Sequence, residues 1–530
     1  MTYTRVKGDG PQKYLYEYES YWDPKRKTSR QRLVHYHGPC DKKGKVLKHP
    51  SVRVDHVHSA FSVGPFAVFY AIAQELQILK RIKETLVVEP QKASLILLLA
   101  LNQTVHRLPL SRLPDWAIAS PFPKWQKLEP DKITRPTLDD ALSAISHLSP
   151  ERDWDQRGYH LQEALTRAWR GTSREPAAYY YDITKQSYYG NSCPWAAIGH
   201  DANGGLSQVI GFGLVVSRDH HYPVLCRPLP GSVNDTVTVA DTLKMLQAFG
   251  LKGVTLVMDR GMISKANIDR VAGAEYHQVG LVRDWNNQTS EYASRWPGEV
   301  LEKPEFVVAR SRGTVAYARA FTAPLFGRDM RVGVIEDFQR KAEERQIRDL
   351  MLSELDGHPS PQRLREIRQQ LHGVISPSLG RRGFQIDKKA VDREKALDGR
   401  FLLFSTDMSM DARKMYEIYF GKDAIEKVFR TGKGELSLGP IRYRRKDRVD
   451  AYATILYMSF LLWSWAECKL HKKYPAMSLD EAIRSLENIS WVRFGAGKHI
   501  RDWVTRMTDQ QEDLVSALGA ERYLHSAQNG

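Results

Sequence analysis

The chain has 530 residues, of which 42% are hydrophobic and 10% aromatic, so it can bury several cores. Lysine and arginine number 78 against 62 aspartate and glutamate residues, which gives a net charge of +16. This balance favours a polyanionic partner, nucleic acid first and an acidic membrane surface second. The four cysteines are isolated and form no CxxC pair, so the pattern predicts neither a zinc knuckle nor a disulfide framework.

The N-terminal region, residues 12–38, alternates aromatic and polar side chains around the turn DPKRKTSR, which predicts a β-hairpin with a charged tip. Its cations fit either an ordinary solvated turn or a contact with the DNA backbone, and both readings stay open. The N-terminus lacks the apolar core of a signal peptide, and the uncharged run 451–466 is too short to span a bilayer. We expect a cytoplasmic, nucleoid-associated protein that makes no membrane contact.

Helical periodicity fills residues 62–118 and predicts a small bundle. Residues 120–150 are rich in proline and polar groups, and we expect a linker there. From residue 177 the pattern changes to three strands, a helix capped by Asn234 or Asp235, the strand VTLVMDRG, a helix opened by Ser264 and a further strand. This order predicts an α/β fold with the mixed sheet of an RNase H-like core.

Residues 283–400 interrupt that core with a β-rich and helical insertion, after which GRFLLFST restores strand character. We therefore predict six regions. These are a basic hairpin region (1–60), a helical DNA-binding domain with its linker (61–175), the first part of the catalytic core (176–282), the insertion (283–400), the second part of the core (401–470) and a C-terminal helical region (471–530).

A helix predicted over Met415–Lys433 carries one apolar stripe, and beside it an arc of charged and phenolic side chains. The arc consists of Tyr419, Lys422, Glu426, Arg430 and Lys433. Taken alone, this arc fits ordinary ion pairing between residues four apart on a wet surface.

Two further carboxylates favour a catalytic site over ordinary surface ion pairing. Asp182 lies inside the first predicted strand among aromatic neighbours, where strand propensity disfavours it, and Asp259 ends the fourth strand of the core. In the predicted fold these strands are adjacent and the Glu426 helix packs against them. Three convergent carboxylates are ligands suited to Mg²⁺, with Mn²⁺ as a substitute, and paired ions of this kind promote phosphoryl transfer.

The helix reads Tyr-x2-Lys-x3-Glu-x6-Lys, which resembles the Y-x2-R-x3-E-x6-K signature of one group of prokaryotic insertion-sequence DDE transposases. The stretches YDIT, PGSVNDT, VMDRGM and FLLFSTD agree with it, in the right order. The resemblance implies that Asp182, Asp259 and Glu426 form a metal-binding catalytic triad. It also implies that Tyr419, Lys422 and Lys433 contact DNA phosphates, although Lys422 replaces the usual arginine and loses its bidentate geometry.

Basic residues also follow the signature, in IRYRRKDR, where Arg442, Arg444 and Arg445 fit either a solvated helix start or a DNA-backbone contact. The resemblance implies cleavage at the terminal inverted repeats of an element and strand transfer into target double-stranded DNA, by a homodimer. In relatives an insertion aromatic holds a flipped base, and Trp285 and Trp296 lie in the insertion. The alternatives are a stand-alone metal-dependent nuclease and an inactive DNA-binding protein that keeps the fold.

Overall fold

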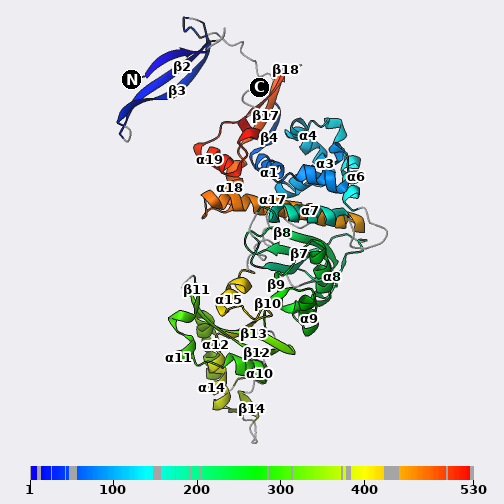
Figure 1. Ribbon diagram of the computed structural model, residues 1–530, viewed down its shortest axis with the longest axis vertical. Helices are drawn as coiled ribbons and strands as arrows, with labels where there is room; N and C mark the ends of the chain where they lie inside the picture. The colour runs from blue at the N-terminus through cyan, green and yellow to red at the C-terminus, as the bar shows by residue number, and fades with distance from the viewer. Residues whose placement is uncertain are drawn as a thin grey trace. The chain divides into compact units, whose positions relative to one another are not determined.

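The computed structural model describes most of the chain, namely residues 2–8, 13–24, 27–41, 43–46, 57–146, 157–172, 175–190, 192–201, 205–282, 286–311, 314–357, 359–371, 374–377, 384–422, 441–496 and 499–525. The chain divides into two compact units. The first comprises residues 1–63, 488–507 and 522–530, and the second comprises residues 64–487 and 508–521. Each unit is described by itself (Figure 1).

The first unit contains two antiparallel sheets of three strands. One is formed by β1 (Thr2–Lys7), β2 (Lys13–Asp23) and β3 (Thr28–Cys40), so the predicted hairpin is confirmed and gains a third strand. The other is formed by β4 (Val57–Ser62), β17 (Ser490–Ala496) and β18 (His499–Val504), with β17 in the middle. The C-terminal region was predicted as mostly helical, and the pair β17–β18 departs from that prediction.

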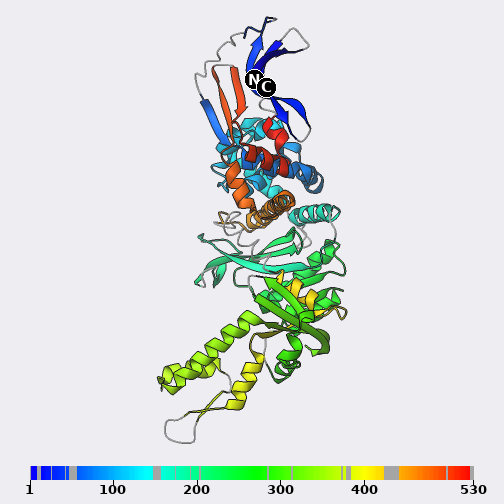
Figure 2. The same cartoon turned by 90° about the vertical axis from the view of Figure 1, so that its left-hand side faces the viewer.

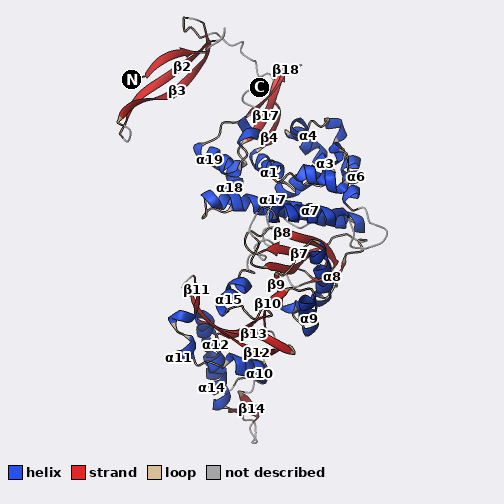
Figure 3. Ribbon diagram, in the orientation of Figure 1, coloured by secondary structure: helices blue, strands red, loops and turns tan. Residues whose placement is uncertain are grey.

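Helices of the second unit form a layer against one face of a large sheet (Figures 1 and 3). At the N-terminal side, α1 (Gly64–Glu75), α2 (Ile78–Leu86), α3 (Pro90–Val105) and α4 (Leu113–Ala119) confirm the predicted bundle. The long helix α17 (Lys446–Lys473) lies between this bundle and strand β8 (Pro223–Pro230). The helices α7 (Arg157–Arg170), α18 (Leu479–Leu486) and α19 (Asp509–Leu518) also belong to this unit, whereas α20 (Glu521–His525) lies mostly in the first unit.

Residues 120–150, which were predicted to be a linker, instead contain α5 (Phe122–Gln126), the short 3-10 helix η1 (Pro130–Lys132) and α6 (Arg135–Ile145). Thr134 caps α6 through the backbone N–H of Thr137, and the Thr137 side chain returns the bond to the Thr134 backbone. The helix buries an apolar stripe with helical spacing, Leu138, Ala141, Leu142 and Ile145. The prediction was wrong because the flanking prolines, one of them in the first turn of α6, obscured this stripe.

The core of the large sheet confirms the predicted order of elements. Strands β5 (Tyr179–Ser187), β7 (Leu206–Ser217) and β8 pair antiparallel, and β6 (Ala197–His200) pairs with the far end of β7. They are followed by α8 (Asp235–Ala248), β9 (Thr255–Met258), η2 (Arg260–Met262), α9 (Lys265–Gly273) and β10 (His277–Leu281). Strand β9 runs parallel to both β5 and β10, so β5 and β9 occupy the middle of the sheet.

Strands of the predicted insertion extend this same sheet. β16 (Arg400–Ser405) pairs with β10 on one side and with β13 (Arg328–Asp337) on the other, and β12 (Thr314–Leu325) and β11 (Val307–Ser311) follow. Around them lie α10 (Asn287–Ala293), α11 (Gly298–Leu301) and η3 (Pro304–Phe306). The helices α12 (Phe338–Asp356), α13 (Pro361–Gln370) and α14 (Lys388–Leu397), with the pair β14 (Ile375–Pro377) and β15 (Phe384–Ile386), extend away from the sheet (Figure 2).

The helix predicted over Met415–Lys433 is shorter than expected. Asp411 caps its start through the backbone N–H of Lys414, but α15 covers only Ala412–Phe420. Lys422 therefore lies beyond the helix, in a turn, and does not share a helical arc with Tyr419. Residues 423–433 of the predicted helix lie outside the described residues. The uncharged run 451–466 lies in α17 and is buried except at Trp465, which is half-buried. Among the described residues, no helix is long and apolar enough to cross a membrane.

Candidate active site and nucleic-acid interface

Two carboxylates meet at the centre of the large sheet. The parallel pairing of β5 with β9 places Tyr181 opposite Met258, so the next residues, Asp182 and Asp259, occupy neighbouring positions in the same register. Side chains opposite each other on adjacent strands share a face of the sheet. The sheet thus brings together two acids that are far apart in the sequence, at the end of β9.

A lysine just beyond the end of α15 reaches this pair. The ammonium nitrogen of Lys422 donates to Oδ1 of Asp259 at 2.5 Å, and the Lys422 side chain is only 13% exposed. Burial opposes the charged lysine, yet the bond to Asp259 and the charges of both acids outweigh it and raise the pKa of Lys422. Lys422 is therefore held as a cation beside the two carboxylates.

Strand β5 also fixes the chain that carries Lys422. The buried hydroxyl of Tyr180 donates to the carbonyl oxygen of Ile418 at 2.9 Å and so anchors the last turn of α15. Gly421 follows, and a Cβ there would clash with that hydroxyl oxygen and stand 3.0 Å from the carbonyl oxygen of Glu417. The helix ends here because only a glycine can pass so close to Tyr180.

The pKa values of the acids at this site are shifted by burial and by their mutual charges. Burial raises the pKa of Asp182 to about 6, against attraction from Lys422 and with help from the nearby charge of Asp259. Partial burial also opposes ionisation of Asp259, but the hydrogen bond and charge of Lys422 prevail and lower its pKa. A further acid, Asp235 in the first turn of α8, has its pKa raised by burial and by the charge of Asp259.

The third predicted acid, Glu426, lies outside the described residues, as do Arg430, Lys433 and Trp285. Within the described part of the chain, no three His, Cys, Asp or Glu side chains stand close enough to hold a metal ion. Asp182 and Asp259 nevertheless suit a divalent metal ion, because they offer hard oxygen ligands whose mutual repulsion a cation would relieve. A complete site needs at least one ligand from elsewhere.

Two of the predicted DNA-contact residues, Tyr419 and Trp296, have neighbours other than the two carboxylates. Tyr419 lines a separate cavity of about 420 Å³ with Phe420, Phe401 and Arg340. Trp296 packs against Phe321, with the Arg319 guanidinium 4.7 Å from its ring centroid, as a packing residue does.

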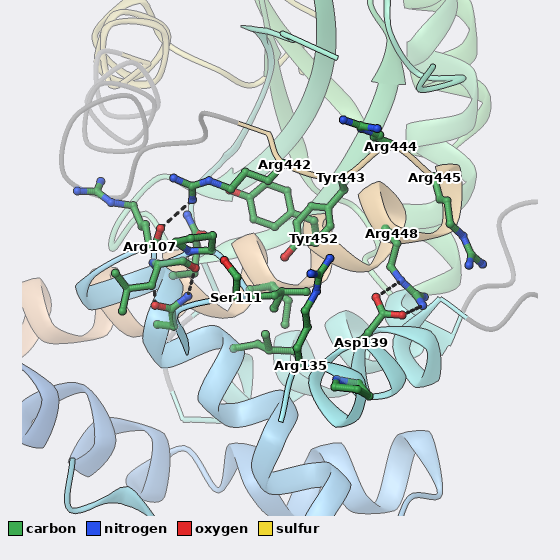
Figure 4. Close-up of a pocket in the computed structure, with 18 residues that line it drawn as sticks. Arg107, Ser111, Arg135, Asp139, Arg442, Tyr443, Arg444, Arg445, Arg448 and Tyr452 are labelled. Carbon is green, nitrogen blue, oxygen red and sulfur yellow. Dashed lines mark hydrogen bonds and ion pairs between the residues drawn. The ribbon is translucent and has the colours of Figure 1, made fainter. Parts of the chain in front are cut away.

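The predicted basic segment lines a cavity of about 530 Å³ in the second unit (Figure 4). Arg442, Arg444 and Arg445 come from the stretch before α17, and Arg107 and Arg135 come from the helical bundle. Figure 4 shows Arg135 reaching from α6 toward Tyr443 and Tyr452. Together with Arg448 these are six arginines, and Asp139 is the single carboxylate of the lining, so the cavity suits an anion.

Internal bonds hold this cavity open. The amide of Asn102 donates to the carbonyl oxygen of Leu108 and accepts from its N–H, which fixes a turn where Arg107 has a φ of 55°. The carbonyl oxygen of Arg107 accepts from Nη1 of Arg442 at 2.9 Å. On the other side, Arg448 binds Asp139 through two nitrogens at 2.9 and 2.7 Å. The side chains of Arg442 and Arg448 are thus held in place by bonds within the protein.

Sequence reasoning missed Asp235, Arg107 and Arg135. Asp235 was considered only as a helix cap, although Asn234 has that role, with its Oδ1 accepting from the N–H of Thr236 at 3.0 Å. The signal for Arg107 and Arg135 was weaker, since single arginines in a helical bundle carry no motif. Only the fold brings them beside the basic segment.

The comparisons with known proteins show the family of the chain. The family model described as the transposase DDE domain matches residues 182–462, just over half of the chain, and its match begins at Asp182. The comparison with curated proteins gives no match.

Two solved structures are similar. The first is the cryo-EM structure of the piggyBac transposase synaptic complex with hairpin DNA (10% identity, 81% of this chain and 79% of that chain, TM-score 0.39). The second is the Mos1 transposase paired-end complex with the left transposon end (11% identity, 32% and 56%, TM-score 0.15). Both TM-scores lie below 0.5. The family of the chain is therefore assigned from the transposase DDE domain match alone.

Proposed function

Because the chain belongs to the transposase DDE domain family and is thus a DNA transposase, we propose that Asp182, Asp259 and Glu426 are its catalytic carboxylates. The observation that carries the proposal is the register of β5 and β9, which sets Asp182 and Asp259 side by side. Glu426 is included because of its position in the sequence pattern Tyr419-x2-Lys422-x3-Glu426-x6-Lys433.

These three acids would hold divalent metal, Mg²⁺ or in its place Mn²⁺. When bound, such ions activate an attacking oxygen and stabilise the leaving one during phosphoryl transfer. In the chain itself, Lys422 neutralises Asp259 and lowers the electrostatic repulsion between the carboxylates. The same cation stands where a phosphodiester approaching the acids would need a positive partner.

The reaction that this arrangement fits has two stages. Water attacks a phosphodiester at the end of the element, which leaves a 3′-hydroxyl and a 5′-phosphate. The freed 3′-hydroxyl then attacks a phosphodiester of the target DNA, so that one bond is exchanged for another. Two copies of the chain on two terminal repeats of a prokaryotic insertion sequence, in association with the nucleoid, complete the proposal.

The arginine cavity is the proposed DNA-backbone contact, through Arg442, Arg444 and Arg445. Tyr419, Lys422, Arg430 and Lys433 are proposed to contact phosphates nearer the acids. The six arginines of the lining, with Asp139 as the single carboxylate among its described residues, support this role, since DNA affinity comes largely from neutralised phosphates.

The test is cleavage of the flanking DNA ends in Mg²⁺ by the full chain and by Asp182→Asn, Asp259→Asn and Glu426→Gln. Each substitution should abolish cleavage and leave gel-shift binding of the same DNA unchanged. Asp241→Asn serves as the control, because Asp241 lies on α8, outside the proposed triad, and its side chain is 61% exposed. Cleavage retained by any of the three variants would refute that residue's role.

The same cleavage assay distinguishes the transposase from the two alternative functions. A stand-alone nuclease would cut the ends and never join them to a target plasmid, whereas a transposase yields joined products. An inactive DNA-binding protein would shift the DNA and release no cut strand under any metal.

A further inference from the structure

The N-terminal sheet β1–β2–β3 has two chemically different faces. Alternation along β2 and its pairing with β1 and β3 assign eight residues to one side, here called the aromatic face: Tyr3, Arg5, Lys7, Tyr14, Tyr16, Tyr18, Trp22 and Tyr36. The other side, here called the ionic face, carries Glu17, Glu19, Asp23, Arg30, Arg32, His35 and His37. Among the described strand residues, all carboxylates lie on the ionic face.

The ionic face is already partnered within the sheet. Arg32 donates to Glu19 at 2.9 Å, and His37 lies 3.1 Å from Glu17. At one end of this face, the loop after β3 brings Gly44 next to Val6 and Leu15, and Cys40 is buried there. This side of the sheet therefore has its own small core and its own ion pairs.

The aromatic face is a continuous platform of rings. Tyr36 lies against both Tyr16 and Tyr14, at 5.1 and 6.2 Å between centroids, and Tyr3 stacks on Tyr18 at 6.2 Å. The Lys7 ammonium stands 4.7 Å from the centroid of the Tyr18 ring. Trp22 is 62% exposed and Tyr36 is 46% exposed, while Tyr14, Tyr16 and Tyr18 are half-buried, so each ring keeps part of its surface in solvent.

Open rings beside cations, with no acid on their side, match a ligand that has flat π faces and negative charge together. Nucleic acid with unpaired bases has both, because bases stack on aromatic side chains while phosphates meet lysine and arginine. A paired duplex hides its base faces inside the helix and would use only the cations. A second copy of the same face would bring Arg5 and Lys7 against their own counterparts, which like charges oppose.

We propose that the aromatic face of the β1–β2–β3 sheet binds single-stranded DNA, by stacking bases on its tyrosines while Arg5 and Lys7 meet the phosphates. This site is separate from the arginine cavity and needs no metal, although it rests on the chain acting on DNA. It would hold an unpaired strand of the kind that cleavage or local melting at a DNA end exposes.

The experiment measures binding of the full-length chain to a fluorescent single-stranded oligonucleotide and to its duplex, in EDTA, by anisotropy. Tyr16→Ala and Tyr36→Ala should each weaken single-strand binding roughly 5- to 150-fold and leave duplex binding unchanged. Tyr16→Phe, which keeps the ring, should bind as the parent does. Arg5→Ala should reduce the salt dependence of single-strand binding by about 0.7 in the logarithmic slope.

The matched control is Tyr21→Ala. Tyr21 belongs to the same strand β2 and is 42% exposed, but it lies on the opposite face, so its removal should change neither affinity. The proposal is overturned if Tyr16→Ala binds the single strand as the parent does, or if Tyr21→Ala loses as much. It is also overturned if Tyr16→Ala instead abolishes self-association in sedimentation runs without DNA. Metal-dependent end cleavage by the Tyr16→Ala variant then tells whether the proposed function stands independently of this face.

Discussion

The hydroxyl of Tyr180 lies 2.9 Å from the carbonyl oxygen of Ile418, and it joins the strand that carries Asp182 to the helix that delivers Lys422. Gly421 makes this junction possible, because any side chain at that position meets the Tyr180 hydroxyl. We predict that Gly421→Ala lowers the free energy of unfolding by about 1–3 kcal/mol through overpacking. Urea unfolding measures it, and Gly273→Ala, where a Cβ meets nothing within 4 Å, should be neutral.

The two positions should also couple. Tyr180→Phe alone leaves the Ile418 carbonyl without this donor and should cost about 1–3 kcal/mol. Tyr180→Phe with Gly421→Ala should cost less than the sum of the two, because the clashing oxygen is gone. A double-mutant cycle from urea unfolding gives the coupling. Strict additivity would mean that the two side chains do not compete for the same space.

The raised pKa of Asp182 makes a prediction about pH in metal-free buffer. An ordinary aspartate loses its proton near 3.8, but in the fold this carboxyl does so at about 6. The unfolded state therefore binds fewer protons between those values, and stability falls as the pH rises through them. At pH 8 the penalty is complete, at most about 3 kcal/mol. Asp182→Asn should thus stabilise the protein at pH 8 in EDTA and give no such gain at pH 4.

Unfolding curves in denaturant at the two pH values test this prediction. An equal gain from Asp182→Asn at both pH values would show that the charge is not the cause. Added Mg²⁺ should raise the melting temperature of the parent at pH 8, since a ligand that binds only the folded state stabilises it. The Asp182→Asn variant should respond less, because it lacks one of the proposed ligands.

The strands that carry Asp182 and Asp259, and their order in the sheet, were predictable because strand and helix periodicity differ. Asp182 stood out as a charge inside a strand, where strand propensity disfavours it, and its catalytic role with Asp259 stays a prediction. The end of α15 at Phe420 was not predicted, because the periodicity of Tyr419 and Lys422 continues smoothly. The sequence signal at this point is Gly421, since glycine is a poor helix former, and in the fold it lies against the Tyr180 hydroxyl.

The arginine cavity shows a different limit of sequence reasoning. Arg442 and Arg444 were visible as a basic run, but Arg107 and Arg135 come from two other segments. The turn fixed by Asn102 positions Arg107, and the two bonds of this side chain to Leu108 have no sequence signature, whereas Arg135 comes from α6. The six regions and the roles of all the candidate site residues remain predictions.

The ion pair between Arg448 and Asp139 gives a stability prediction. Arg448 is 7% exposed, and Asp139→Asn would remove the carboxylate that accepts two of its bonds and leave only Asp447, at 3.1 Å from Nη1, as an ionic partner among the described residues. Since the Asp139 side chain is itself half exposed, we expect a loss of about 1–3 kcal/mol, below the cost of breaking a fully buried pair. Asp140→Asn is the control, as its exposed pair with Lys92 should contribute under about 1 kcal/mol.

The pair should also respond to acid. The hydrogen bond from Arg448 lowers the pKa of Asp139, so its contribution is present above the ordinary aspartate pKa and is lost as the pH falls through the lower, folded value. The difference between the parent and Asp139→Asn should therefore shrink at strongly acidic pH. A difference that stays constant with pH would assign the loss to packing instead.

Arg135 gives the sharpest test of the arginine cavity, since it reaches into the cavity from α6 (Figure 4). Arg135→Ala should weaken duplex binding at every sequence and reduce the logarithmic salt slope by about one, as expected when one phosphate contact is lost. Arg167→Ala is the matched control, because Arg167 is 75% exposed on α7 and pairs with Glu163 outside the cavity. Anisotropy titrations of duplex DNA at four salt concentrations give both slopes. If both variants kept the parental slope, DNA phosphates would not enter the cavity, and the basic segment before α17 would be an ordinary solvated surface.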